Sequence, residues 1–162
     1  MKKIAFVLFS ILVILTFSAC SSIPEPQITK AEFPFEIVYE IDGELITVTD
    51  TYVCEFEGVY RNAAVGEYLE WKGYVKSTGN NYLVLLEDGN LQLVCSLGSA
   101  AYYMGDPAME GTQKYTPSIY YVKTLASGNV VSGMLGIEPI LEQYKIKLVS
   151  WKLSEPLENT FR

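Results

Sequence analysis

Two Asp-Gly pairs, at residues 42–43 and 88–89, each separate two runs of apolar and β-branched residues. Such a pair between such runs is the strongest short-range signal for a β-hairpin with a two-residue turn. If these turns set the register, each strand residue has a defined partner. The expected pairs in the first hairpin are Ile41–Glu44, Tyr39–Ile46 and Ile37–Val48. The expected pairs in the second are Leu86–Leu91, Val84–Leu93 and Tyr82–Cys95.

The rest of the chain continues this pattern of short strands. Further strands are expected at residues 51–56, 68–76, 117–125 and 144–153, and short helical segments at 99–104 and 137–144. Strands at near-regular spacing with glycine turns between them are typical of all-β domains. The sequence therefore predicts a mainly β fold, an antiparallel β-sandwich or a small β-barrel with one or two short helices.

Residues 1–20 have the organisation of an export signal. Two lysines are followed by the apolar run 4–17, which as a helix would span about 21 Å, short of the roughly 30 Å hydrocarbon core. Ser18 and Ala19 then lead into Cys20, an ending that resembles the lipobox of bacterial lipoproteins, with Phe17 where that family mostly has leucine. The alternatives are an ordinary secretory signal that is cut near a cysteine, and an uncleaved anchor helix.

The resemblance to bacterial lipoproteins implies lipidation of Cys20. In that family the cysteine thiol receives a diacylglyceryl group, the chain is cut before it, and the new amino end is usually acylated. We therefore expect a signal peptide at 1–19, the lipidated cysteine and a tether at 20–32, and a single β-rich domain at 33–162. An extended tether of this length would reach roughly 35–40 Å. The expected location is the extracytoplasmic face of the cell membrane, with the membrane as a partner through the lipid.

The charge of the mature chain bears on its other partners. Loss of Lys2 and Lys3 leaves 10 Lys and Arg (12 − 2) against 19 Asp and Glu, a net charge of −9. An acidic domain repels phosphate backbones, so nucleic acid is not expected as a partner.

The chain contains no histidine. This excludes Ser-His-Asp and Cys-His nucleophile systems, histidine general bases and histidine-bound zinc. The sequence also shows no phosphate-binding glycine loop, no nucleophile motif and no spacing of metal ligands. We expect no cofactor and no metal, and we assign no catalytic residue.

Cys54 and Cys95 both alternate with apolar neighbours and should point into the core. Export would allow a disulfide between them, and closing a loop of about 40 residues would stabilise the fold by roughly 4 kcal/mol in the chain-entropy model. The alternative is two buried, inert thiols. The sequence slightly favours the disulfide.

Adjacent tyrosines are the candidate ligand contacts, because one of each pair should be exposed if they lie on strands. They are Tyr102, Tyr103, Tyr120 and Tyr121. For any one of them, an ordinary strand residue is the simpler interpretation. Two carboxylate pairs, Glu55 with Glu57 and Asp106 with Glu110, are candidates for glycosidase chemistry, which needs two carboxylates across a cleft. A solvated acidic surface explains both pairs more simply.

The mature part resembles small secreted lipoproteins of unknown function from Gram-positive anaerobic bacteria. The segments that carry the resemblance are "DTYVCEFEGV", "EYLEWKGYV", "CSLGSAAYYMGDP" and "KIKLVSWKLSEPLENTF". The resemblance implies no activity. We expect a non-catalytic binding module for an envelope component, a glycan or a protein. The alternatives are a carboxylate-based glycan hydrolase and a structural or inhibitory partner of another envelope protein.

Overall fold

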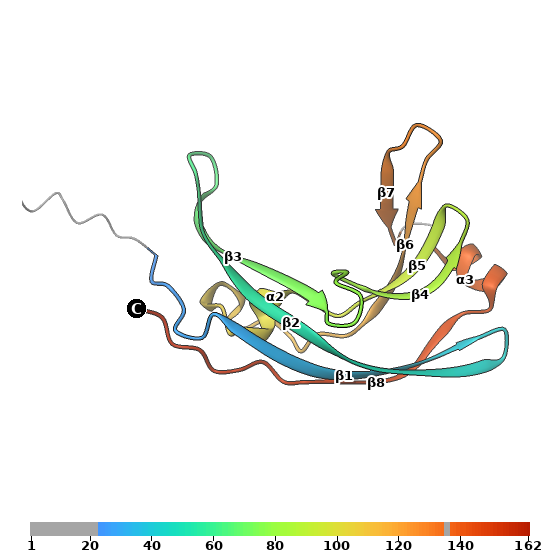
Figure 1. Cartoon of the computed structure of the whole chain (residues 1–162), viewed down its shortest axis with the longest axis horizontal. Helices are drawn as coiled ribbons and strands as arrows, with labels where there is room; N and C mark the ends of the chain where they lie inside the picture. Colours follow the sequence, from blue (N-terminus) through green and yellow to red (C-terminus); the bar gives the residue numbers. More distant parts are fainter. Residues whose placement is uncertain (1–22, 135–136) are drawn as a thin grey trace, which may run out of the picture.

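The computed structural model describes residues 23–134 and 137–162, so the predicted signal peptide and Cys20 lie outside the described residues (Figure 1). The chain forms two four-stranded antiparallel sheets, ordered β3-β2-β1-β8 and β4-β5-β6-β7. The first sheet comprises β1 (Lys30–Ile41), β2 (Glu44–Asn62), β3 (Gly66–Val75) and β8 (Lys147–Leu153). The second comprises β4 (Leu83–Asp88), β5 (Leu91–Ser96), β6 (Ser118–Thr124) and β7 (Val130–Gly133).

Short helical elements join the strands. They are α2 (Ala100–Tyr103), the 3-10 turn η1 (Pro107–Met109) and α3 (Glu138–Tyr144). The prediction of a mainly β, antiparallel fold with one or two short α-helices is therefore confirmed. No helix within residues 23–134 and 137–162 combines the length and apolar character needed to cross a bilayer.

The first hairpin has the register expected from its turn. Ile41 faces Glu44, and the two further predicted pairs, Tyr39–Ile46 and Ile37–Val48, also form. Asp42 and Gly43 have φ values of +50° and +86°. Positive φ at both central residues is the requirement of a type I′ turn, which Asp-Gly meets at low cost.

The predicted register of the second hairpin is wrong. Asp88 pairs with Leu91, so the turn is Gly89-Asn90, and only Gly89 has a positive φ, +61°. Gly at the first central position is the pattern of a type II′ turn. A β-bulge between Val84 and Leu86 then shifts the register again. The observed pairs are Leu83–Cys95, Val84–Val94 and Leu86–Leu93.

Two hairpins project from the body on the same side (Figure 1). The β2–β3 arm (residues 59–69) arises because the strand expected at 51–56 is part of one long strand, β2, which runs from Glu44 to Asn62. The β6–β7 arm (residues 121–133) contains β7, which was not expected from the sequence.

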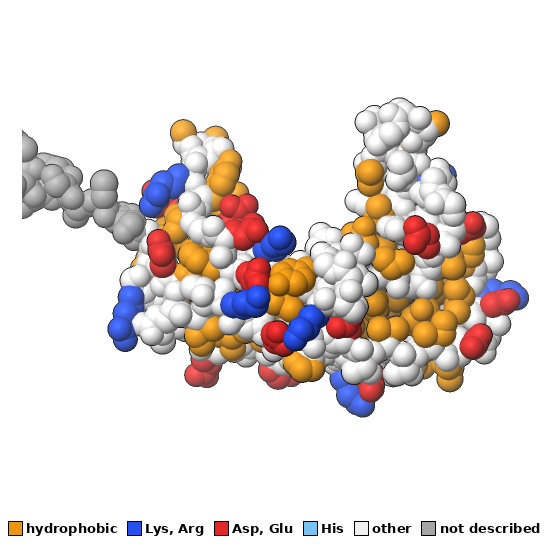
Figure 2. Space-filling model, in the orientation of Figure 1, with side chains coloured by type: hydrophobic (Ala, Val, Ile, Leu, Met, Phe, Trp, Pro, Cys, Tyr) orange, Lys and Arg blue, Asp and Glu red, His pale blue; other side chains and the backbone are white. Residues whose placement is uncertain are grey.

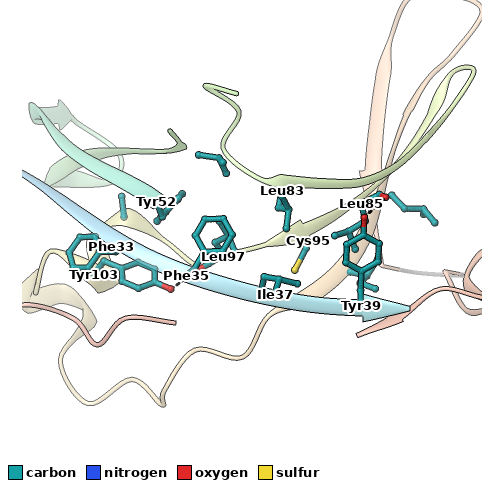
Figure 3. Packing of buried hydrophobic residues seen from close by; sticks show 14 of the residues in the cluster. Phe33, Phe35, Ile37, Tyr39, Tyr52, Leu83, Leu85, Cys95, Leu97 and Tyr103 are labelled. Atoms are coloured by element: carbon teal, nitrogen blue, oxygen red, sulfur yellow. Dashed lines mark hydrogen bonds between the residues drawn. The ribbon is translucent and has the colours of Figure 1, made fainter. Parts of the chain in front are cut away.

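The core lies between the two sheets (Figure 3). Side chains of β1 point toward side chains of the second sheet and of α2; those labelled include Phe33, Phe35, Ile37, Tyr39, Leu83, Leu85, Cys95, Leu97 and Tyr103. Buried tyrosine hydroxyls donate to backbone carbonyls across the core: Tyr39 to Leu85 at 3.1 Å, and Tyr103 to Leu97 at 2.7 Å. These bonds satisfy hydroxyl groups that would otherwise be costly to bury.

The domain begins earlier than predicted. Pro26 is buried and forms a β-bridge with Phe161, and β1 starts at Lys30. Two backbone hydrogen bonds join Glu25 to Arg162, at 2.9 and 3.0 Å. The predicted boundary at residue 33 is therefore corrected, because this backbone finds partners in the C-terminal segment. Residues 25–32 of the segment predicted as a tether are therefore part of the folded domain.

Candidate binding site

Two large hollows lie at opposite ends of the domain. The terminal hollow, about 760 Å³, lies beside η1 and the C-terminal segment, near both termini. The distal hollow, about 640 Å³, lies between the β4–β5 turn, the β6–β7 arm and α3. Figure 1 shows α3 and the β4–β5 turn at the end remote from the termini. In Figure 2, hydrophobic side chains gather near both ends of the visible face, and the surface between the arms is hollowed.

Tyr121 and Lys123 of β6 form one wall of the distal hollow. They are two residues apart on a strand, so their side chains share a face. Gly133 lies opposite Tyr121 on β7, and Val131 lies opposite Lys123. Because Gly133 has no side chain, β7 leaves the half-buried ring of Tyr121 uncovered on that side.

α3 forms the facing wall with Ile140, Gln143 and Tyr144. Its sequence suits a short helix, because both Glu138 and Pro139 lie in the first turn, where an acidic residue and a proline are favoured. The Tyr144 hydroxyl donates to Asp88 Oδ2 at 2.5 Å, across to the β4–β5 turn. This hydrogen bond is the main reason that the pKa of Tyr144 lies above its usual value.

The distal hollow has polar groups that the fold does not use. Among the described residues, Lys123 Nζ forms no ion pair, and the Gln143 amide forms no hydrogen bond. A tyrosine ring beside an ammonium group, an amide and a carboxylate offers one apolar face with donors and acceptors around it. Such a surface suits a ligand that carries both CH groups and hydroxyls.

In the terminal hollow Asp106 and Asn159 are occupied by the fold. Asp106, 7% exposed, accepts hydrogen bonds from Trp71 Nε1 and from the backbone N–H of Ala108, both at 2.8 Å. The Asn159 amide donates to the carbonyls of Ile28 and Met104 and accepts from Ile28 N–H. These side chains hold η1 and the C-terminal segment in place, so we assign them a structural role.

The four candidate tyrosines do not share one surface. Tyr121 lines the distal hollow and Tyr102 the terminal hollow. Tyr120 packs edge-on against Tyr82, with ring centroids 6.1 Å apart. Tyr103 is 2% exposed and belongs to the core, so it is withdrawn as a ligand contact.

Contacts within the fold occupy Glu55 and Asp106, one carboxylate of each candidate catalytic pair. Glu55 forms an ion pair with Lys30 and accepts a 3.0 Å hydrogen bond from Tyr74, and these contacts lower its pKa. The pairing of β2 with β3 shifts beside Glu57, which interrupts the regular alternation expected to place it with Glu55. Asp106 and Glu110 both line the terminal hollow, but both oxygens of Asp106 are already hydrogen-bonded.

Cys54 and Cys95 are free thiols, both fully buried in the core. The structure thus has two buried thiols at these positions, which was the alternative to the disulfide. Burial raises the pKa of each thiol to about 12. Neither thiol is therefore a nucleophile at neutral pH.

Sequence reasoning did not assign Asp88, Lys123, Gln143 or Tyr144 to a site. Asp88 was interpreted only as a turn residue, and no local motif links it to side chains 35 to 56 positions away. In the part of the chain that the structure describes, no group of three or more Cys, Asp or Glu side chains could hold a metal ion. Comparison with protein-family models, curated proteins and solved structures finds no match to this chain.

Proposed function

We propose that this protein is a lipid-anchored, extracytoplasmic binding module that holds a glycan segment of the cell envelope in the distal hollow. The observation that carries the proposal is the combination of an uncovered tyrosine ring with unused polar side chains in one hollow of about 640 Å³. Sugars present CH faces and hydroxyls together, and the distal hollow offers partners for both. The anchor part of the proposal depends on the lipobox-like sequence that ends at Cys20.

The position of the hollow supports this assignment. It lies at the end of the domain remote from residue 23, where the chain leaves toward Cys20 (Figure 1). A site at that end stays open to the envelope when the opposite end is held at a membrane. The terminal hollow is less suited to recognition, because Asp106 and Asn159 already use their polar atoms within the fold.

The test is glycan binding by the mature lipoprotein, purified in mild detergent, on an array of cell-wall and host glycans. We expect Lys123→Ala and Gln143→Ala each to weaken binding by about tenfold, the usual size of one lost hydrogen bond to a charged or polar group. Lys72→Ala and Gln113→Ala are the matched controls, since both are exposed and lie outside the distal hollow. The controls should bind like the wild type.

Other outcomes would replace the proposal. Binding of a peptide or protein, but of no glycan, would change the ligand class. Turnover of a glycan that is lost in Glu110→Gln would move the function to the terminal hollow and to hydrolysis. Equal effects of the hollow variants and their controls would show that the distal hollow is not the site.

A further inference from the structure

The chain enters the domain beside the base of the β2–β3 arm. Ile23 and Pro24 line an apolar groove of about 520 Å³ together with Tyr68, Leu69 and Phe161. The backbone hydrogen bonds between Glu25 and Arg162 hold this entry point against the C-terminal segment. The chain that leads back to Cys20 therefore leaves from this groove.

The arm tip and Cys20, the predicted site of lipid attachment, lie at similar chain distances from the apolar groove. Cys20 precedes Ile23 by three residues, which span at most about 11 Å. The tip of the arm at Ala64 is four residues from Tyr68, about 13 Å along a strand. Both start from the same groove, so Cys20 and the arm tip can reach one common plane.

The surface of the arm suits a bilayer interface. Val65 at the tip is 74% exposed, and residues 62–66 carry no charged side chain. Below the tip, the rings of Tyr60 and Tyr68 stack with centroids 4.9 Å apart, each about 40% exposed. Tyrosine is enriched at the level of lipid headgroups, where its ring meets apolar matter and its hydroxyl meets water.

The charges nearest the tip compensate each other. Arg61 Nε and Glu67 Oε1 form an ion pair at 3.0 Å across the arm. The mature chain as a whole is acidic, so attraction to anionic lipid would not bring the arm to a membrane. Contact with a bilayer would instead come from apolar side chains, with little dependence on lipid charge.

We infer that the β2–β3 arm is a second contact with the bilayer that carries the lipid-modified Cys20. This inference rests on the proposed function, because the lipid at Cys20 brings the arm to the membrane. The tip at residues 63–65 enters the headgroup region, and the Tyr60–Tyr68 pair lies at its outer edge, with the apolar groove behind the pair. The lipid at Cys20 and the arm tip together fix the orientation of the domain.

The test uses the full mature lipoprotein in phosphatidylcholine vesicles. An environment-sensitive fluorophore is attached at Val65→Cys, or at Leu45→Cys beside the β1–β2 turn as the matched exposed control. Cys54 and Cys95 should stay unlabelled in the folded protein, because both are buried. We expect a blue shift and several-fold stronger quenching by lipid-borne nitroxides at position 65 than at position 45.

A second pair of variants tests the chemistry of the tip. With the label at Ala64→Cys, Val65→Asp should return the emission to that of a water-exposed probe, whereas Val65→Thr should retain most of the shift. Protein that pellets with vesicles but has equal quenching at 65 and 45 would overturn the inference while the anchor stands. Protein that does not pellet would overturn both. A blue shift in detergent-free buffer without vesicles would indicate self-association of the arm and would also overturn the inference.

Discussion

Asp106 and Asn159 at the terminal end hold neighbouring backbone and Trp71, whereas Lys123 and Gln143 at the distal end have no partner among the described residues. The contacts that close the two ends differ in the same way. The buried Asp106 carboxylate fixes η1, and the Asn159 amide fixes the C-terminal segment. α3 is instead joined to the hairpin turns by exposed contacts, Tyr144 to Asp88 and Lys145 to Asp42.

This difference follows from the cost of desolvation. A buried polar group without a partner costs roughly 1–3 kcal/mol, so burial at the terminal end requires that Asp106 be paired. Exposed groups at the distal end are satisfied by water and are under no such constraint. Unused polar groups therefore remain at the distal end, where a ligand can replace the water.

The largest expected effect is on Asp106. Asp106→Ala leaves Trp71 Nε1 and Ala108 N–H without their acceptor and should lower the free energy of unfolding by about 2–4 kcal/mol. Urea unfolding followed by circular dichroism measures the change. Asp88→Ala is the matched loss at the distal end, and its unfolding midpoint should match the wild type. Equal losses in the two variants would contradict the comparison between the ends.

The two buried thiols in the core should make the free energy of unfolding fall at alkaline pH. Folding raises the pKa of Cys54 and Cys95 from about 9, the ordinary thiol value, to about 12. Above pH 9 the unfolded chain then binds fewer protons than the folded chain, so stability falls as pH rises toward 12. The slope is at most about 1.4 kcal/mol per pH unit for each thiol.

Urea midpoints between pH 7 and pH 10 measure this fall, with each protein referred to its own value at pH 7. The Cys54→Ala/Cys95→Ala double variant should lose less stability over this interval than the wild type. An identical fall in both proteins would show that the thiols are not responsible. Tyr52 and Tyr103, whose pKa values are also raised by burial, add to the fall only above pH 10.

Gly105 tests how closely the C-terminal segment packs at the terminal end. A Cβ at Gly105 would lie 2.5 Å from the carbonyl oxygen of Leu157, and φ is +63°. Gly111 also has a positive φ, +75°, but a Cβ added there would have no neighbouring atom within 4 Å. Both alanine variants therefore share the backbone strain, and only Gly105→Ala adds the clash.

We expect Gly105→Ala to unfold at lower urea than Gly111→Ala, by about 1–3 kcal/mol, the usual cost of overpacking. Faster cleavage of the C-terminal segment by a carboxypeptidase should accompany the loss. Equal stability of the two variants would mean that the segment moves aside freely, and the terminal end would then be no more rigid than the distal end.

The first hairpin shows what local sequence can determine. Asp42-Gly43 supplies positive φ at both turn positions, and the alternation of β1 then places Phe35, Ile37 and Tyr39 in the core. At Asp88-Gly89 the same dipeptide predicted the wrong register. The turn there is Gly89-Asn90, and a bulge in β4 accommodates the extra residue. The predicted and the observed register of the β4–β5 hairpin both fit the local sequence pattern. That pattern does not contain the packing of β5 against β6.

The candidate site depended on contacts that no local pattern contains. Tyr121 was identified because adjacent tyrosines on a strand must face opposite ways, and this reasoning held for β6. It failed for Tyr102 and Tyr103, which lie on α2, although there too one ring is buried. Lys123 and Gln143 meet Asp88 only through the order of the second sheet and the placement of α3, which the sequence did not determine.

The smallest expected effect concerns Lys145, where α3 ends at the distal end. Lys145 has φ +49°, a left-handed conformation that glycine adopts without strain, and its ammonium pairs with the exposed Asp42. Lys145→Ala removes the ion pair but keeps the Cβ, and its urea midpoint should equal that of the wild type, because exposed pairs contribute little. Lys145→Gly also removes the strain, so its midpoint should rise slightly above that of Lys145→Ala. A clear loss in Lys145→Ala would show that the exposed pair does hold α3, and the distal end would then depend on its polar contacts as the terminal end does.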